Sequence, residues 1–277
     1  MVLRPLRRVA SLVGLLLAVA VMVVVPTTAQ AGPAYPVVTA DQARSFDVTF
    51  DVAEDGSVLV TERIAWEFPS GEQRRGIERL ITTRVGYQDR DDVYRQYAIS
   101  DIEVSSPTGA PDDVNVSDFG STVRIRVGDP DIFISGIQEY VVSYRLGKIV
   151  NDIQDGTAEF YFNLIAPSNN NIYQGISATV TGPAAATRSA CFYGELGATN
   201  ECTHSPGETA TFSSPDVGPG QGVTIITSYP REAFGDLTPE LVDYDSGGGF
   251  GERSSIPATA QRAIGGLLLG TGVLLPV

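Results

Sequence analysis

Apolar and polar residues alternate along most of this chain, and this period of two restricts the fold more than any other feature of the sequence. Between residues 46 and 52, phenylalanine and valine occupy the even positions, with aspartate and threonine between them. A second alternating run covers residues 58–68, after the turn sequence Glu54-Asp55-Gly56-Ser57. Two such runs joined by turn residues predict a β-hairpin.

Further alternating runs continue this pattern over residues 44–230. They centre on residues 123–127, 140–146, 160–164, 176–180 and 223–227. We therefore expect an all-β fold, an antiparallel β-sandwich of about ten to twelve strands. The Gly182-Pro183 step is where we expect a main sandwich, residues 32–182, to give way to a smaller β extension, residues 183–235.

The first 31 residues have the features of an export signal. Three arginines among the first eight residues precede an uncharged apolar run over residues 9–25, and Ala29-Gln30-Ala31 follows. This order predicts a signal peptide that is cleaved after Ala31. An uncleaved membrane anchor is the alternative, because the apolar run reaches the lower length limit of a spanning helix.

Export determines how the two cysteines are interpreted. Cys191 and Cys202 lie in a segment rich in glycine, threonine and serine. In an oxidising compartment such a pair is most simply one disulfide. A metal site that adds His204 is the alternative, but zinc needs a fourth ligand and closer cysteine spacing is usual. We therefore expect the disulfide in the β extension.

The C-terminal part changes character twice. Residues 236–262 are acidic and rich in glycine and serine, which predicts a linker. Residues 263–277 are uncharged and largely apolar, but as a helix they span only about 22 Å of a hydrocarbon core of about 30 Å. Two interpretations stay open: a short tail that dips into the membrane, or the start of a transmembrane helix that the sequence does not complete, which we favour.

One residue breaks the alternation in the second run. Glu62 falls on the apolar face of residues 58–68, where a carboxylate must be paired or must reach an opening. Arg79 and Arg75 are the candidate partners, and we expect one of them to form a structural ion pair with Glu62. The catalytic alternative, Glu62 as a general acid or base, lacks a second carboxylate that the sequence places beside it.

Charge and motifs exclude several functions. The chain has 33 acidic and 19 basic residues, a net charge of −14, and phosphate-backbone binding needs clustered positive charge. We therefore expect no nucleic-acid partner. The sequence shows no glycine-rich phosphate loop and no nucleophile elbow, and it has a single histidine. From this we expect no cofactor, no metal site and no enzymatic activity.

Several separate motifs occur in order along the chain: Asp55-Gly56-Ser57-Val58, Val60-Thr61-Glu62, Arg75-Gly76-Ile77, Arg124-Ile125-Arg126-Val127-Gly128, Tyr140-Val141-Val142-Ser143-Tyr144-Arg145 and Glu159-Phe160-Tyr161-Phe162-Asn163. Together they resemble one known family, the N-terminal domain of the domain-of-unknown-function 2207 family of predicted bacterial membrane proteins. The resemblance covers about residues 42–235. It implies an extracytoplasmic domain tethered to the membrane, and it implies no activity.

These observations together predict a non-catalytic interaction or scaffold module of the bacterial cell envelope. We expect the membrane as one partner, through the C-terminal segment, and an envelope protein or a glycan as another. A glycan- or cell-wall-binding domain is the first alternative, and it requires an exposed row of aromatic side chains or a cation site. An envelope hydrolase is the second, and it requires titratable residues that converge in a pocket.

Overall fold

A computed structural model describes residues 41–69, 72–88, 90–153 and 155–243. These residues form nineteen strands and one 3₁₀ helix, Arg231–Ala233, so the all-β expectation is confirmed. Across the described part of the chain, no helix is long and apolar enough to cross a membrane. The signal peptide expected over residues 1–31 and the membrane segment expected over residues 263–277 lie outside the described residues.

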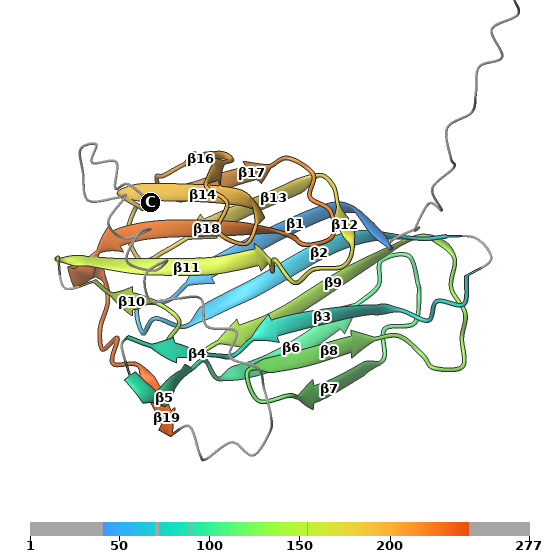
Figure 1. Cartoon of the computed structure of the whole chain (residues 1–277), viewed down its shortest axis with the longest axis horizontal. Helices are drawn as coiled ribbons and strands as arrows, with labels where there is room; N and C mark the ends of the chain where they lie inside the picture. The colour runs from blue at the N-terminus through green and yellow to red at the C-terminus, as the bar shows by residue number, and fades with distance from the viewer. Residues whose placement is uncertain (1–40, 70–71, 89, 154, 244–277) are drawn as a thin grey trace, which may run out of the picture. The chain divides into compact units, whose positions relative to one another are not determined.

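Eight strands form the largest sheet, here called the main sheet (Figure 1). Its order is β16-β17-β13-β1-β2-β9-β6, and β12 pairs with β1. The strands are β1 (Gln42–Val52), β2 (Val58–Phe68), β6 (Ile99–Ser105), β9 (Gly136–Leu146), β12 (Ile172–Tyr173), β13 (Ile176–Thr181), β16 (Thr203–Ser205) and β17 (Thr209–Ser214).

Three smaller sheets complete the described fold. The disulfide sheet has the order β10-β11-β18-β14-β15, with β10 (Asn151–Asp152), β11 (Thr157–Ile165), β14 (Arg188–Glu195), β15 (Asn200–Glu201) and β18 (Gln221–Pro230). The β8 sheet has the order β3-β8-β7, with β3 (Ile77–Thr82), β7 (Val114–Asp118) and β8 (Thr122–Val127). The β5 sheet has the order β19-β5-β4, with β4 (Arg84–Tyr87), β5 (Arg90–Gln96) and β19 (Glu240–Asp243).

The hairpin expected from the first two alternating runs is present as β1 and β2. Its turn closes through a hydrogen bond from the Ala53 amide to the Ser57 carbonyl oxygen at 2.8 Å. The Ser57 amide also donates to the Asp55 side chain at 2.9 Å, and Gly56 adopts a φ of 77°. Aspartate and glycine are therefore placed where the turn needs a side-chain acceptor and a left-handed backbone.

Three details differ from the sequence-based expectation. The described residues hold more strands than the ten to twelve expected, because six of them have only two to four residues and are too short to show alternation. β1 pairs in parallel with β12 and β13, whereas an antiparallel fold was expected. Residues 240–243, assigned to the linker, form β19 beside β5. Each pairing joins segments far apart in the chain, which local periodicity does not report.

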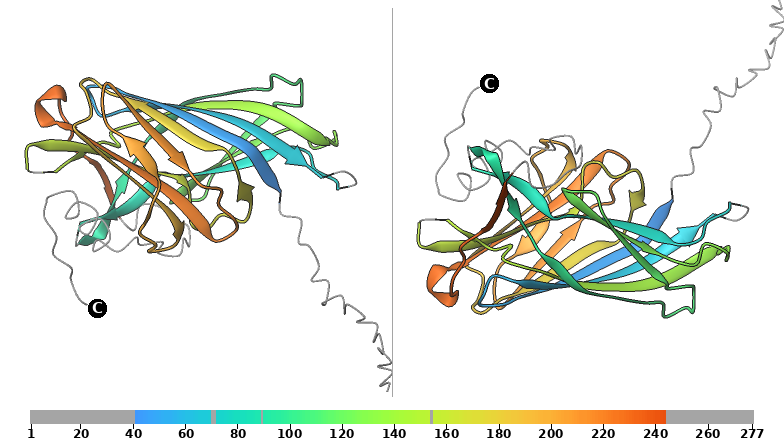
Figure 2. Two further views of the ribbon diagram at one scale, coloured as in Figure 1. Left: turned by 90° about the horizontal axis from the view of Figure 1, so that it is seen from above. Right: turned by 90° about the horizontal axis from the view of Figure 1, so that it is seen from below.

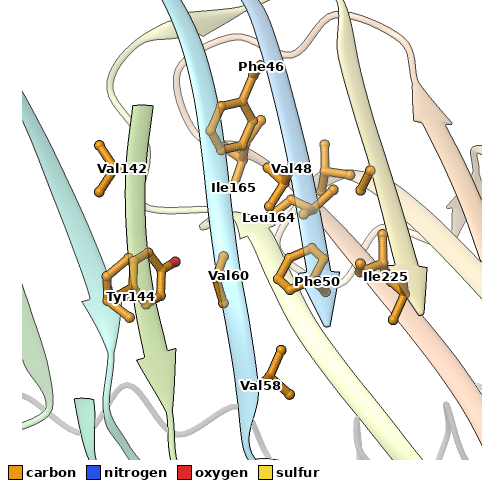
Figure 3. Close-up of a cluster of buried hydrophobic side chains, with 14 of the residues drawn as sticks. Phe46, Val48, Phe50, Val58, Val60, Val142, Tyr144, Leu164, Ile165 and Ile225 are labelled. Carbon is orange, nitrogen blue, oxygen red and sulfur yellow. The ribbon is translucent and has the colours of Figure 1, made fainter. Parts of the chain in front are cut away.

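A shared apolar core joins the main sheet to the disulfide sheet and the β8 sheet. Figure 3 shows part of it, where alternate residues of β1 and β2 point to the same side. Phe50 of β1 contacts Phe160 and Phe162 of β11 at ring-centroid distances of 5.2 and 5.1 Å. The ribbons of β11, β18 and β14 accordingly lie over those of β1 and β13 in two views (Figures 1 and 2).

Strands from both sides of the Gly182-Pro183 step share these sheets. β13 precedes the step and pairs with β17, while β11 precedes it and pairs with β18. The step thus falls between β13 and β14, inside one continuous core. The change in composition marks a turn at this step. Strands after the step pair with strands before it, so residues 183–235 share their sheets with the preceding residues.

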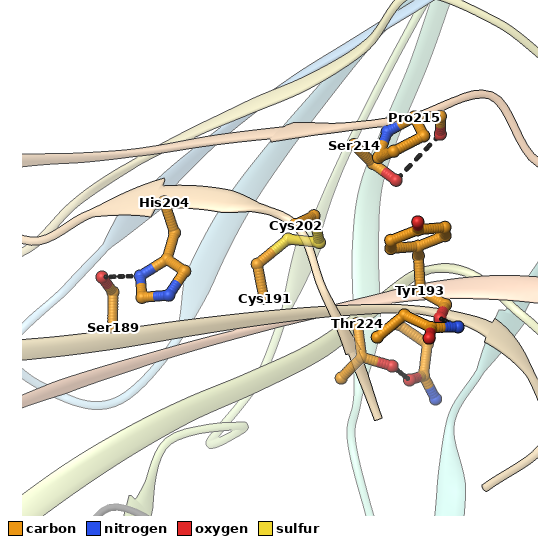
Figure 4. The surroundings of a disulfide bond; sticks show 10 residues. Ser189, Cys191, Tyr193, Cys202, His204, Ser214, Pro215 and Thr224 are labelled. Atoms are coloured by element: carbon orange, nitrogen blue, oxygen red, sulfur yellow. Dashed lines mark hydrogen bonds between the residues drawn. A yellow bond between two sulfur atoms is a disulfide. The ribbon is translucent and has the colours of Figure 1, made fainter. Parts of the chain in front are cut away.

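The expected disulfide is confirmed between Cys191 and Cys202 (Figure 4). Cys191 lies in β14 of the disulfide sheet, and Cys202 lies where the chain passes from β15 to β16 of the main sheet. Both cysteines are buried, at 1% and 6% exposure. The bond therefore fixes the point at which the chain crosses between two sheets.

Replacing both cysteines, as Cys191→Ser/Cys202→Ser, should lower the free energy of unfolding by about 3 kcal/mol, because the unfolded chain regains the freedom of an eleven-residue loop. Urea titration monitored by tryptophan fluorescence measures the change. The wild-type chain titrated with a reductant present is the matched control and should show the same loss. An unchanged midpoint in both cases would contradict this account of the disulfide.

Candidate functional site

The structure brings Glu62 and Arg79 together as a buried, two-pronged ion pair. Arg79 Nε lies 2.5 Å from Glu62 Oε2, and Arg79 Nη2 donates to Glu62 Oε1 at 2.9 Å. Glu62 is fully buried and Arg79 is 8% exposed. Glu62 belongs to β2 of the main sheet and Arg79 to β3 of the β8 sheet, so the pair joins two sheets.

Two tyrosines complete the surroundings of the pair. The Tyr144 hydroxyl donates to Glu62 Oε1 at 2.9 Å, and Arg79 Nη1 donates to the Tyr173 hydroxyl at 3.5 Å. The Arg79 guanidinium also lies 5.0 Å from the centre of the Phe46 ring. Each charged group thus has several partners, as a charge removed from water requires.

The electrostatics support this assignment of donors and acceptors. Burial is the largest influence and lowers the pKa of Arg79, but the charge and hydrogen bond of Glu62, together with Tyr173 and Tyr144, outweigh it, so the pKa lies above its usual value. Burial, and next the charge of Glu62, raise the pKa of Tyr144 well above its usual value. Arg79 therefore stays charged and Tyr144 stays protonated.

Arg75, the other candidate partner, is placed elsewhere. Its guanidinium lies 4.2 Å from the centre of the Phe133 ring. Arg75 also lines a hollow that lies at the start of β3 and the end of β8. The hollow has a volume of about 620 Å³. Its lining includes charged and amide side chains from five separate segments, namely Asp41, Arg75, Glu78, Asp113, Asn115, Arg126, Asp129 and Asn171.

Two glycines let the backbones at this hollow approach closely. A Cβ on Gly76 would lie 1.7 Å from the Val127 carbonyl oxygen, and one on Gly128 would lie 2.0 Å from the Arg75 carbonyl oxygen. Both glycines also have positive φ angles, 154° and 132°. The Gly76 and Gly128 positions therefore exclude any side chain, and they set the shape of the hollow.

Three of the acidic side chains around the hollow already interact with other groups of the chain. Asp41 accepts a hydrogen bond from Arg74 at 2.9 Å. Glu78 lies 3.8 Å from Arg126. Asp129 accepts a hydrogen bond from the Asp131 amide at 2.7 Å. The sequence analysis did not predict this hollow, because its lining comes from segments spread between residues 41 and 171. The Arg75-Gly76 and Val127-Gly128 pairs are its local signal in the sequence.

His204 is held by Ser189, whose hydroxyl lies 2.9 Å from His204 Nδ1 (Figure 4). Both residues flank the disulfide, on β16 and β14. The described residues contain no group of three or more histidine, cysteine, aspartate or glutamate side chains arranged to hold a metal ion. Ser189 and His204 thus serve as a contact between two sheets beside Cys191 and Cys202.

The variant Glu62→Ala should lower the free energy of unfolding by about 3 to 5 kcal/mol, because it leaves the Arg79 guanidinium buried and unpaired. The double variant Glu62→Leu/Arg79→Met should cost less than this single change, since it removes both charges. Denaturant titration gives both values. Asp92→Ala is the matched control, because the Arg90–Asp92 pair is solvent-exposed and its loss should leave the stability almost unchanged.

Glu159 on β11 should make stability depend on pH near neutrality. Burial raises its pKa to about 7, with Arg188 opposing and Asp155 adding to the shift. The folded state therefore holds the proton more tightly than the unfolded chain, and this stabilisation is lost as the pH rises through about 7. Unfolding midpoints measured between about pH 4.5 and pH 7 should fall in the wild type and stay level in Glu159→Gln. Glu201→Gln, at an exposed carboxylate of the same sheet, should follow the wild type.

Comparison with solved structures gives only weak likenesses. Leukotriene A4 hydrolase from Saccharomyces cerevisiae matches 68% of this chain and 29% of its own, at 9% identity and a TM-score of 0.39. A protease-like protein from Parabacteroides distasonis matches 69% of this chain and 41% of its own, at 10% identity and a TM-score of 0.37. The LppM folded domain from Mycobacterium tuberculosis matches 70% of this chain and 93% of its own, at 13% identity and a TM-score of 0.25.

This chain spans less than half of the length of the two enzymes, and likenesses at these TM-scores carry no argument about function. No curated protein matches the chain. The family comparison is specific by contrast, since one family model covers residues 42–229, nearly all of the described strands. The chain therefore belongs to the family described as the predicted membrane protein (DUF2207) N-terminal domain.

Proposed function

We propose that residues 32–235 act as a non-catalytic interaction module of a membrane-anchored protein, on the extracytoplasmic side of a bacterial cell membrane. The family is one of predicted membrane proteins, which supports the attachment to a membrane. The disulfide supports an oxidising location, because such bonds are rare in the cytosol. In this proposal the described sheets form a sandwich-like framework, and the apolar residues 263–277 contribute to membrane attachment.

The surroundings of the Glu62 side chain support a non-catalytic role. Its two oxygens are occupied by Arg79 and Tyr144, and no part of the residue reaches solvent. A general acid or base must lie within hydrogen-bond reach of a substrate. In our proposal Glu62 therefore holds sheets together and takes no part in chemistry.

The hollow beside the β8 sheet is the main observation that supports an interaction role. Besides the charged and amide side chains of its lining, two exposed apolar side chains lie at the hollow: Val114 in the lining is 42% exposed, and Phe133, which contacts Arg75, is 52% exposed. A hollow of about 620 Å³ is in the size range of ligand sites. Exposed apolar side chains beside such a hollow are typical of a surface that binds a partner.

A photo-crosslinking residue in place of Asn115, in the hollow, tests the proposal in membranes that contain the full chain. We expect one discrete cross-linked envelope protein, and we expect it to disappear in the Asp113→Arg variant, which reverses a charge in the hollow. The same cross-linker in place of Glu201, on the exposed edge of the disulfide sheet, is the matched control.

Equal cross-linking from both positions would contradict an interaction site at the hollow. Loss of the Asn115 cross-link on addition of purified cell-wall polysaccharide, with direct binding of that polysaccharide to the chain, would favour the alternative of a glycan-binding domain. Trp66, the aromatic residue in the lining, is only 4% exposed, so the hollow offers little of the aromatic surface that sugar stacking needs.

A further inference from the structure

Among the described strands, β7 is an edge strand that pairs only with β8. It pairs with β8 over five consecutive positions without a register shift. The Gly128 amide donates to the Asp113 carbonyl oxygen, and the Phe119 amide donates to the Thr122 carbonyl oxygen, so these two bonds bracket the ladder. Because alternate residues of an antiparallel strand bond to the same neighbour, Val114 and Val116 turn their N–H and C=O groups away from β8.

The side chains of the same two residues are also uncovered. Val114 and Val116 lie opposite Val127 and Ile125, which are fully buried, and so they share the apolar face of the β8 sheet. Yet Val114 is 42% and Val116 is 47% exposed. The apolar face of the sheet therefore continues onto β7, beyond the part that the rest of the domain covers.

Other edge strands in the described fold carry features that oppose pairing. β10 and β15 have two residues each, and β16 has three. β6 has a register shift between Ser100 and Glu103, with Asp101 at a φ of 52°. β3 carries charges inside the strand, and β4 and β19 have four residues each, with an arginine at the start of β4 and acidic residues at both ends of β19. Short length, bulges and charges protect sheet edges. β7 has five residues, its pairing with β8 has no register shift, and residues 114–117 carry no charge.

The charges at the two ends of β7 indicate what can pair with it. Asp112 and Asp113 precede the strand and Asp118 ends it, and all three are exposed. Antiparallel pairing of two copies around Val116 would bring Asp118 of one copy toward Asp112 and Asp113 of the other, which like-charge repulsion disfavours. An extended segment with a basic residue at each end meets an acidic group in either direction.

We propose that the β7 edge binds an extended peptide segment of a partner protein, with alternating apolar residues and basic residues at both ends, as a fourth strand of the β8 sheet. Main-chain hydrogen bonds to Val114 and Val116 hold the segment, and its apolar side chains cover theirs. Val114 also lines the hollow, so the edge and the hollow form one continuous surface. This inference rests on the proposed interaction function and names the partner's chemistry.

The test uses the full chain and a fluorescent peptide with lysine at both ends and alternating valine and threonine between them. Val116→Pro removes the outward amide and spares the hydrogen bonds to β8, and proline is tolerated at such an edge position. Val116→Thr is the matched control, because it keeps the amide. We expect fluorescence anisotropy to show about tenfold weaker binding for Val116→Pro, and little change for Val116→Thr.

Two altered peptides test the partner's chemistry. A peptide with glutamate ends should bind more weakly, and one with N-methyl groups along one edge should not bind. Absence of binding by the lysine-flanked peptide, or equal binding to the proline and threonine variants at equal melting temperatures, overturns the inference. A dimer of the chain that forms through β7 also overturns it.

The outcome is distinguishable from that of the proposed function. If the Val116→Pro variant binds the peptide as tightly as the wild type while the Asn115 cross-link persists, the hollow binds a partner without the β7 edge. Only the present inference then fails. If the peptide binds as expected but no specific cross-link forms at Asn115, the proposed role of the hollow fails instead.

Discussion

The ion pair of Glu62 and Arg79 is the contact on which the arrangement of the described sheets depends. A carboxylate in the middle of an apolar sheet face is stable only if a partner removes the cost of burying its charge. Here the partner comes from β3, in another sheet, and Tyr144 and Tyr173 satisfy the remaining positions. The pair therefore joins the β8 sheet to the main sheet, beside the apolar core that the two sheets share.

This framework places the exposed features of the domain together. The hollow lies at the start of β3 and the end of β8, where Gly76 and Gly128 bring two backbones into contact. β7 follows as the outer strand of the same sheet. The surface we propose for binding thus belongs to a three-stranded sheet that the buried pair joins to the main sheet, while the disulfide fixes the point at which the chain crosses from the disulfide sheet to the main sheet.

Local features of the sequence were enough to predict the hairpin of β1 and β2, the all-β class, the disulfide and the two possible partners of Glu62. Each depends on alternation, turn residues or a residue type that breaks a pattern. The parallel pairing of β1 with β13, the strand β19 and the hollow were not predictable in this way. They depend on which distant segments meet, and for that the sequence offers at most the glycines at positions 76 and 128 as a local signal.

Native-state hydrogen exchange on the Glu62→Gln variant tests the central claim most directly. If the pair holds the β8 sheet on the main sheet, amides of β3 and β8 lose protection first, while those of β11 and β18 in the disulfide sheet keep it. Unchanged protection of β3 and β8, or an equal loss over all sheets at low denaturant, would contradict the role we assign to Glu62 and Arg79.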